Sequence, residues 1–226
     1  MQRFAFILLF ILSTSCSKEE INNSIIEPSA TLGDTYISHR FKDQLKTTQL
    51  ISRLSLIFPN ADSLVHPKYD ITVYRIFYKT HDFQNNEITA SGLVYVPEIT
   101  RHHVPIVCYQ HGTVFHKEEV PSIVGDLSYF APFILASESG AIVCAADYIG
   151  LGFSDGIQHY FEPTEEANAV IDMLGSVQIL LNKTYHSLTF NNEVYLTGYS
   201  QGGHATLAAQ QRLETLYRYQ FQIKAS

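Results

Sequence analysis

The sharpest chemical signal in this sequence is a serine flanked by two glycines. Residues 198–202 read Gly-Tyr-Ser-Gln-Gly, after a strand-like run at 193–197 and before an Ala-rich, helix-like run at 201–219. A serine on such a sharp turn takes a strained backbone conformation, and glycines two positions either side leave room for close helix packing. The pattern predicts that the Ser200 hydroxyl is exposed above helix N-terminal N–H groups that can stabilise an oxyanion. The plainer interpretation is a Gly-rich turn with an incidental serine.

Two further polar segments each follow an apolar run. Gln110-His111-Gly112-Thr113 ends the run at 104–110, and Asp-Tyr-Ile-Gly-Leu-Gly-Phe-Ser at 147–154 ends the run at 141–146. Uniformly apolar strands that alternate with helices indicate a parallel sheet covered on both faces. The carboxyl ends of such strands lie at one edge of the sheet, which would bring these segments near Ser200.

The elements that must position this site divide into two parts. Two strands at 71–79 and 88–96 are close enough in sequence to form an antiparallel hairpin. Beyond residue 97 we expect strands at 104–110, 141–146 and 193–197, with helices at 120–139, 164–182 and 201–219. Apolar residues also recur at helical spacing over 41–58, ahead of the sheet, and Pro59-Asn60 ends that run.

The three polar motifs, in this order, resemble the first part of an α/β-hydrolase, most closely its secretory lipase and esterase branch. The resemblance covers about residues 69–219. It implies an N-terminal antiparallel hairpin that leads into a mostly parallel sheet covered by helices, with the C-terminal strands absent. Asp147 corresponds to a position after the fourth strand in many members of this family. It is expected to shape the neighbouring loop rather than to act as the catalytic acid.

The resemblance also implies a role for each site residue. Ser200 is the expected nucleophile, and the N–H of Gln201 is the first oxyanion donor because it follows the nucleophile. The second donor is Thr113, with Val114 the next choice. The remaining residues are expected to support these two parts: His111 and Gly112 in the oxyanion loop, and Gly198 and Gly202 in the nucleophile elbow.

A serine nucleophile needs a base, and the base needs a carboxylate that orients it. In α/β-hydrolases both follow the serine in chain order. Residues 203–226 contain His204 and Glu214, and both fall inside the helix that follows the nucleophile. We therefore expect an N-terminal fragment or early-ended product of a longer hydrolase, with little or no turnover from these 226 residues alone.

The N-terminus has the pattern of an export signal. Arg3 precedes nine apolar residues, and small residues then lead to Cys16. Nine residues are too short for a membrane-spanning helix. The pattern resembles a bacterial lipoprotein signal, which implies a signal peptide at 1–15, lipid on Cys16, a tether at 16–40 and a partial hydrolase domain at 41–226, with the leading helix at 41–58 and the core at 69–226. An ordinary secretory signal is the alternative.

Composition excludes some partners. Lys plus Arg number 15 against 22 Asp plus Glu, a formal net charge of −7, which argues against nucleic acid. His102-His103 lack a third ligand at metal spacing, so we expect no metal and no cofactor. Cys108 and Cys144 lie in apolar runs and are expected to be buried thiols rather than a disulfide.

The function expected from these observations is hydrolysis of carboxylic esters, lipase-like or esterase-like, through an acyl-enzyme on Ser200. Two alternatives stay open, namely a serine peptidase of the same fold and a non-catalytic envelope lipoprotein. The expected location is the bacterial cell envelope, with a lipid anchor in a membrane and the domain facing the periplasm or the surface, or else the secreted fraction.

Overall fold

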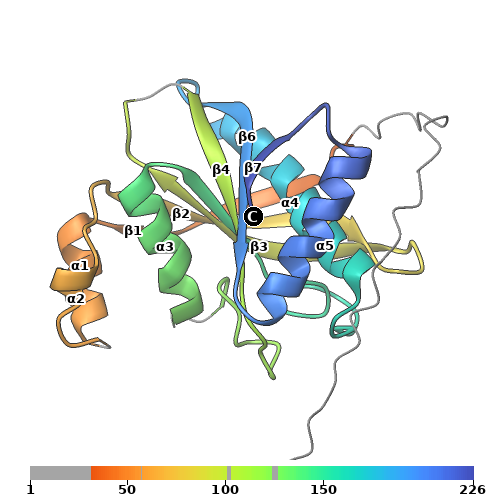
Figure 1. Ribbon diagram of the computed structural model, residues 1–226, viewed down its shortest axis with the longest axis horizontal. Coiled ribbons are helices and arrows are strands. Elements are labelled where there is room, and N and C mark those ends of the chain that lie inside the picture. The colour runs from red at the N-terminus through yellow and green to blue at the C-terminus, as the bar shows by residue number, and fades with distance from the viewer. Residues whose placement is uncertain (1–31, 57, 101–102, 124–126) are drawn as a thin grey trace, which may run out of the picture.

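A single sheet runs through the middle of the protein, and helices lie on both of its faces (Figure 1). The computed structural model describes residues 32–56, 58–100, 103–123 and 127–226, and within them the sheet has seven strands in the order β1-β2-β3-β5-β4-β6-β7. In chain order the strands are β1 (Tyr36–Leu45), β2 (Ile71–His81), β3 (Glu87–Pro97), β4 (His103–Gln110), β5 (Ile142–Ala146), β6 (Thr189–Gly198) and β7 (Gln222–Ala225). The predicted signal peptide at 1–15, Cys16 and most of the predicted tether lie outside the described residues.

The sheet has an antiparallel side and a parallel side, as expected. β1, β2, β3 and β5 pair antiparallel in that order, whereas β5, β4, β6 and β7 pair parallel. The predicted hairpin is β2 and β3, which pair from Ile71 opposite Pro97 to His81 opposite Glu87. Residues Gln222–Ala225, which follow α5, form β7 and pair parallel with β6.

The predicted helix at 41–58 is wrong over its first part. Residues 36–45 form β1, which pairs with β2 from Tyr36 opposite Tyr78 to Leu45 opposite Ile71. Backbone pairing with β2 outweighs the helical spacing of a few apolar residues, and Phe41 stays 63% exposed. The helix is confined to α1 (Thr47–Ser55), which buries Leu50 and Leu54. The predicted tether at 16–40 likewise extends too far, since residues 36–40 belong to β1.

Two hydrophobic cores occupy the two faces of the sheet. α4 (Pro163–Thr184) and α5 (Gln201–Leu216) cover one face, while α1, α2 (Ala61–Leu64) and α3 (Leu127–Ser139) contribute to the core on the other. Side chains of β3 alternate between them, with Val94 and Val96 on the α4–α5 side and Leu93 and Tyr95 on the α3 side. The strands β4, β5 and β6 therefore belong to a sheet that is packed on both faces.

The start of the predicted helix at 120–139 also needs correction. Residues 120–123 form a turn in which the Ile123 N–H donates to the Val120 carbonyl at 3.0 Å, and α3 begins at Leu127. Ser122 is drawn away from helical geometry because its backbone N–H donates to the Asp147 carboxylate. The loop after β4 therefore packs against the loop after β5.

The two cysteines of the sheet are buried and free, as expected. Cys108 in β4 lies opposite Cys144 in the parallel strand β5, and their sulfur atoms are 3.4 Å apart. Among the described residues, no helix has the length and apolar character needed to cross a membrane.

Candidate active site

Ser200 lies at the point where β6 gives way to α5. Its backbone has φ 57° and ψ −118°, a conformation that residues other than glycine rarely adopt. The residue is the N-cap of α5, yet its hydroxyl makes no capping hydrogen bond, and the side chain is exposed. The turn thus leaves the hydroxyl exposed to solvent instead of using it to cap the start of α5.

The two glycines of the elbow let backbone segments approach each other. A Cβ atom on Gly198 would lie 2.1 Å from the Gly202 carbonyl oxygen, and one on Gly202 would lie 2.0 Å from the carbonyl oxygen of Gln110. Both clashes are with backbone, which cannot move aside as a flexible side chain can. The close packing of β4, β6 and α5 under Ser200 therefore depends on both glycines.

The side chain of Gln110 forms hydrogen bonds beneath the elbow that were not predicted from the sequence. In the amide orientation that satisfies both polar atoms, its nitrogen donates to the carbonyls of Thr197 at 2.6 Å and Cys108 at 3.0 Å. Its backbone carbonyl accepts from the N–H of Tyr199 at 3.4 Å. Gln110 is buried and links the ends of β4 and β6.

The loop at 111–113 lies next to the elbow. A Cβ atom on Gly112 would come within 3.2 Å of both the ring and the carbonyl of Tyr199, so the two segments are in contact across this glycine. The Thr113 hydroxyl and the Tyr160 hydroxyl are 2.8 Å apart. The structure therefore brings the predicted oxyanion loop beside the predicted nucleophile.

His111 is fixed in this loop by backbone and ring contacts. Its Nδ1 lies 2.7 Å from the Gly112 carbonyl and its Nε2 lies 3.3 Å from the Asp147 carbonyl. The buried ring lies against Tyr148 with centroids 4.3 Å apart, and the Tyr148 hydroxyl donates to the His111 carbonyl. Burial raises the pKa of Tyr148 well above its ordinary value. These contacts suit loop support and leave neither ring nitrogen directed at Ser200.

Asp147 is enclosed by loop residues and not by the elbow. Its carboxylate accepts from the Ser91 hydroxyl at 2.5 Å and from the Ser122 N–H at 3.2 Å. A Cβ atom on Gly152 would meet it at 2.4 Å. Burial raises the pKa of the Asp147 carboxyl above its ordinary value. The arrangement agrees with the expected role of Asp147 in shaping the loop.

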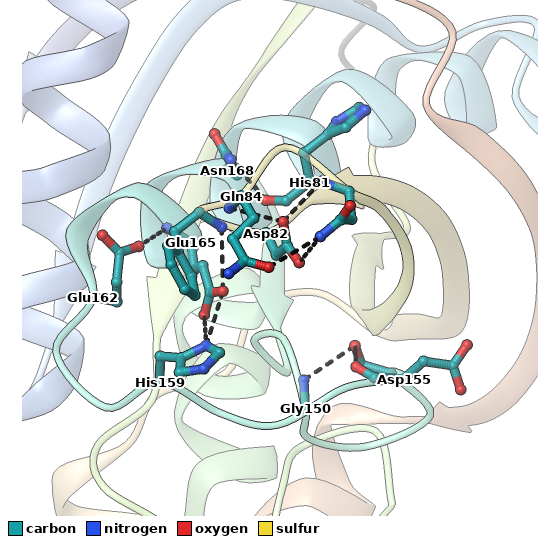
Figure 2. Close-up of polar contacts among 12 residues, drawn as sticks. His81, Asp82, Gln84, Gly150, Asp155, His159, Glu162, Glu165 and Asn168 are labelled. Carbon is teal, nitrogen blue, oxygen red and sulfur yellow. Dashed lines mark hydrogen bonds and ion pairs between the residues drawn. The ribbon is translucent and has the colours of Figure 1, made fainter.

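The first turn of α4 carries two buried carboxylates, Glu165 and Glu166, which were not among the predicted site residues. Glu162 caps the helix by accepting from the Glu165 N–H at 2.7 Å. Glu165 then faces His159 and the β2–β3 turn (Figure 2), with its carboxylate 3.0 Å from His159 Nδ1. Glu166 faces the other way and accepts from Gln201 Nε2 at 2.8 Å and His204 Nδ1 at 2.6 Å.

His204 is thereby assigned to a packing position. Its ring meets the Phe161 ring edge to face, with centroids 4.7 Å apart, while Nδ1 is bound to Glu166. Within the part of the chain that the structure describes, no hydrogen bond joins the Ser200 hydroxyl to a histidine. The same residues hold no group of three or more His, Cys, Asp or Glu side chains arranged for a metal ion.

No protein-family model matches the chain, and no curated protein does. Solved structures do match. A proposed hydrolase from Legionella pneumophila shares 28% identity at a TM-score of 0.75, with 84% of this chain covering 50% of that one. The rice cell wall degrading esterase LipA from Xanthomonas oryzae, in a ligand-bound form, shares 27% identity at a TM-score of 0.72, with 84% covering 48%.

A more distant likeness extends the same fold. Lipase A from Candida antarctica, in its closed state, has a TM-score of 0.55 at 17% identity, with 84% of this chain covering 41% of that one. The chain thus spans about half the length of these proteins or less. With the sheet order described above, these likenesses identify the α/β-hydrolase fold.

Proposed function

We propose that this chain carries the nucleophile of a serine hydrolase that acts on carboxylic esters. The observation that supports this most is the backbone of Ser200, held at φ 57° and ψ −118° with an exposed, uncapped hydroxyl. Such strain persists only where the surrounding structure enforces it, and it recurs at functional sites. The hydrolase and esterase with similar structures point to the same reaction class.

The proposed reaction has two acyl transfers. The Ser200 oxygen attacks the ester carbonyl, its proton passes through a base to the departing alcohol, and an acyl-enzyme forms. Water then attacks this acyl group and releases the acid. The N–H groups of Gln201 and Thr113 are the proposed donors to the oxyanion, because Gln201 opens α5 and Thr113 lies in the loop beside the elbow.

The base and its carboxylate are the parts that this mechanism still requires. Both ring nitrogens of His111 contact backbone carbonyls, and Nδ1 of His204 contacts the Glu166 carboxylate. Neither histidine is therefore proposed as the base. We propose little or no turnover for these 226 residues by themselves, because turnover also needs a base and a carboxylate that orients it.

A fluorophosphonate probe tests the nucleophile. We expect the protein as the gene encodes it to be labelled, and mass spectrometry to map the adduct to Ser200. Heat-denatured protein is the control, because an unfolded serine has no oxyanion site and no base. Absence of any adduct on the folded protein would favour a non-catalytic scaffold.

We also propose that the domain is tethered to the bacterial cell envelope by lipid on Cys16. The support is the charged, apolar and small-residue pattern that ends at this cysteine. Growth with an alkyne fatty acid should label the natural protein, and Cys16→Ser should abolish the label and release the domain from membranes. Export of an unlabelled natural protein would instead indicate an ordinary secretory signal.

A further inference from the structure

The carboxylate of Glu166 is almost fully enclosed between α4 and α5. Its side chain is 4% exposed, and it lies in the first turn of α4, where the helix dipole favours negative charge. One oxygen accepts from Gln201 Nε2 and the other from His204 Nδ1. Both donors belong to the first turn of α5, so this one carboxylate spans the helical turn directly after Ser200.

The contact with Gln201 carries particular weight. The Gln201 side chain is fully buried, and its carbonyl oxygen Oε1 has no hydrogen-bond partner among the described residues. Its amide nitrogen is held at 2.8 Å by Glu166. This hydrogen bond is important because, within the described part of the chain, it is the one that the buried amide group makes. Without it, neither the oxygen nor the nitrogen of the amide would replace the hydrogen bonds to water that burial removes.

We propose that Glu166 is a positioning residue that sets the place of the Gln201 N–H in the oxyanion site. The inference rests on the proposed function, since it needs an oxyanion next to Ser200. By holding the Gln201 side chain and the His204 ring together, Glu166 fixes the orientation of the first turn of α5. The N–H that is aimed at the developing charge then needs no rearrangement during the reaction.

Glu165 provides a matched control for this proposal. It precedes Glu166 in the same helical turn, and its side chain is equally buried, at 4% exposure. It also pairs with a histidine, His159, and accepts from the Phe83 N–H at 3.3 Å. Its partners lie in the β2–β3 turn and the loop before α4 (Figure 2) and not in α5. Substitution at Glu165 therefore disturbs the same helix without touching Gln201.

Steady-state kinetics on the protein as the gene encodes it separate a positioning role from a structural one. Glu166→Ala should lower kcat by about tenfold to 100-fold and leave KM within about twofold, because the oxyanion donor acts in the transition state. Glu165→Ala, the matched control, should keep kcat within about twofold of the natural enzyme. Equal losses of kcat in both variants, or a change in KM alone, would overturn the proposal.

A conservative variant guards against simple misfolding of Glu166→Ala. Glu166→Gln keeps a carbonyl oxygen for Gln201 Nε2 and turns an NH₂ group toward His204 Nδ1, which a neutral imidazole can accept. We expect this variant to recover most of the kcat that Glu166→Ala loses. A Gln variant as slow as the Ala variant, with natural stability, would contradict a role through hydrogen bonds to Gln201.

Hydrogen exchange tests the positioning claim without any turnover. A peptide spanning 199–206 should exchange about tenfold faster in Glu166→Ala than in the natural protein, and at the natural rate in Glu165→Ala. Unchanged exchange in Glu166→Ala would overturn the inference even if Ser200 is labelled. Faster exchange in Glu166→Ala, in a protein that no fluorophosphonate labels, would show that Glu166 orders the first turn of α5 but would reject the proposed function and the oxyanion site with it.

Discussion

Replacing Ser200 by alanine is expected to remove ester hydrolysis from the protein as the gene encodes it, with a loss in kcat on the order of 10⁴-fold or more. The acyl-enzyme route is lost with the hydroxyl, and only the oxyanion donors and substrate binding remain. A chromogenic short-chain ester measures the loss, and the fluorophosphonate label should vanish with it.

The alanine variant is informative because it leaves the fold unchanged. Alanine keeps the Cβ atom, so the backbone strain at φ 57° stays as it is, and the exposed hydroxyl makes no capping bond whose loss would cost stability. Thr215→Ala, on the exposed side of α5, serves as a control variant that is expressed and purified in the same way and should keep the natural rate. Hydrolysis within about tenfold of the natural rate in Ser200→Ala would rule Ser200 out as the nucleophile.

Replacing Gly202 by alanine is expected to lower the free energy of unfolding by about 3 kcal/mol. The added methyl group would lie 2.0 Å from the Gln110 carbonyl oxygen and 2.8 Å from that of His111. Relief requires α5 to move away from the end of β4, which also displaces the Gln201 N–H. Urea unfolding followed by circular dichroism measures the first effect, and fluorophosphonate labelling measures the second.

The neighbouring glycine supplies the control for this experiment. A Cβ atom on Gly203 would meet nothing within 4 Å, and alanine is favoured over glycine in a helix by up to about 1 kcal/mol. Gly203→Ala should therefore leave the protein unchanged or slightly more stable, with labelling intact. Equal destabilisation by the two substitutions would show that α5 does not pack on β4 as closely as described.

The spacing of apolar residues predicted those elements whose burial pattern is visible within one segment of the sequence. The hairpin of β2 and β3, the buried strands β4 and β5, and α4 all have apolar patterns that a single segment displays. β1 has no such pattern, since Phe41 is exposed and Leu45 buried. Its conformation follows from pairing with β2, a partner that lies far along the chain and that local spacing cannot reveal.

The site shows the same division. The elbow glycines and the His111 loop were predicted because their chemistry is contained in a short run of sequence. The contacts of Gln110, although it opens the predicted loop motif, and of Glu166 were not predicted because their partners come from other elements. Each resembles an ordinary polar residue at a strand end or a helix start. The one available signal was the capping pattern ahead of α4, which places Glu166 in a first turn without indicating what it faces.

At position 200, the residue that would give the more stable fold differs from the residue that supplies the hydroxyl. A backbone at φ 57° and ψ −118° costs about 1–3 kcal/mol for a residue with a Cβ atom, and glycine would adopt it with little cost. Selection for heat resistance alone would therefore drive position 200 toward glycine and remove the hydroxyl. A more robust form of this protein has to gain its extra free energy elsewhere, for example at helix positions with open space such as Gly203.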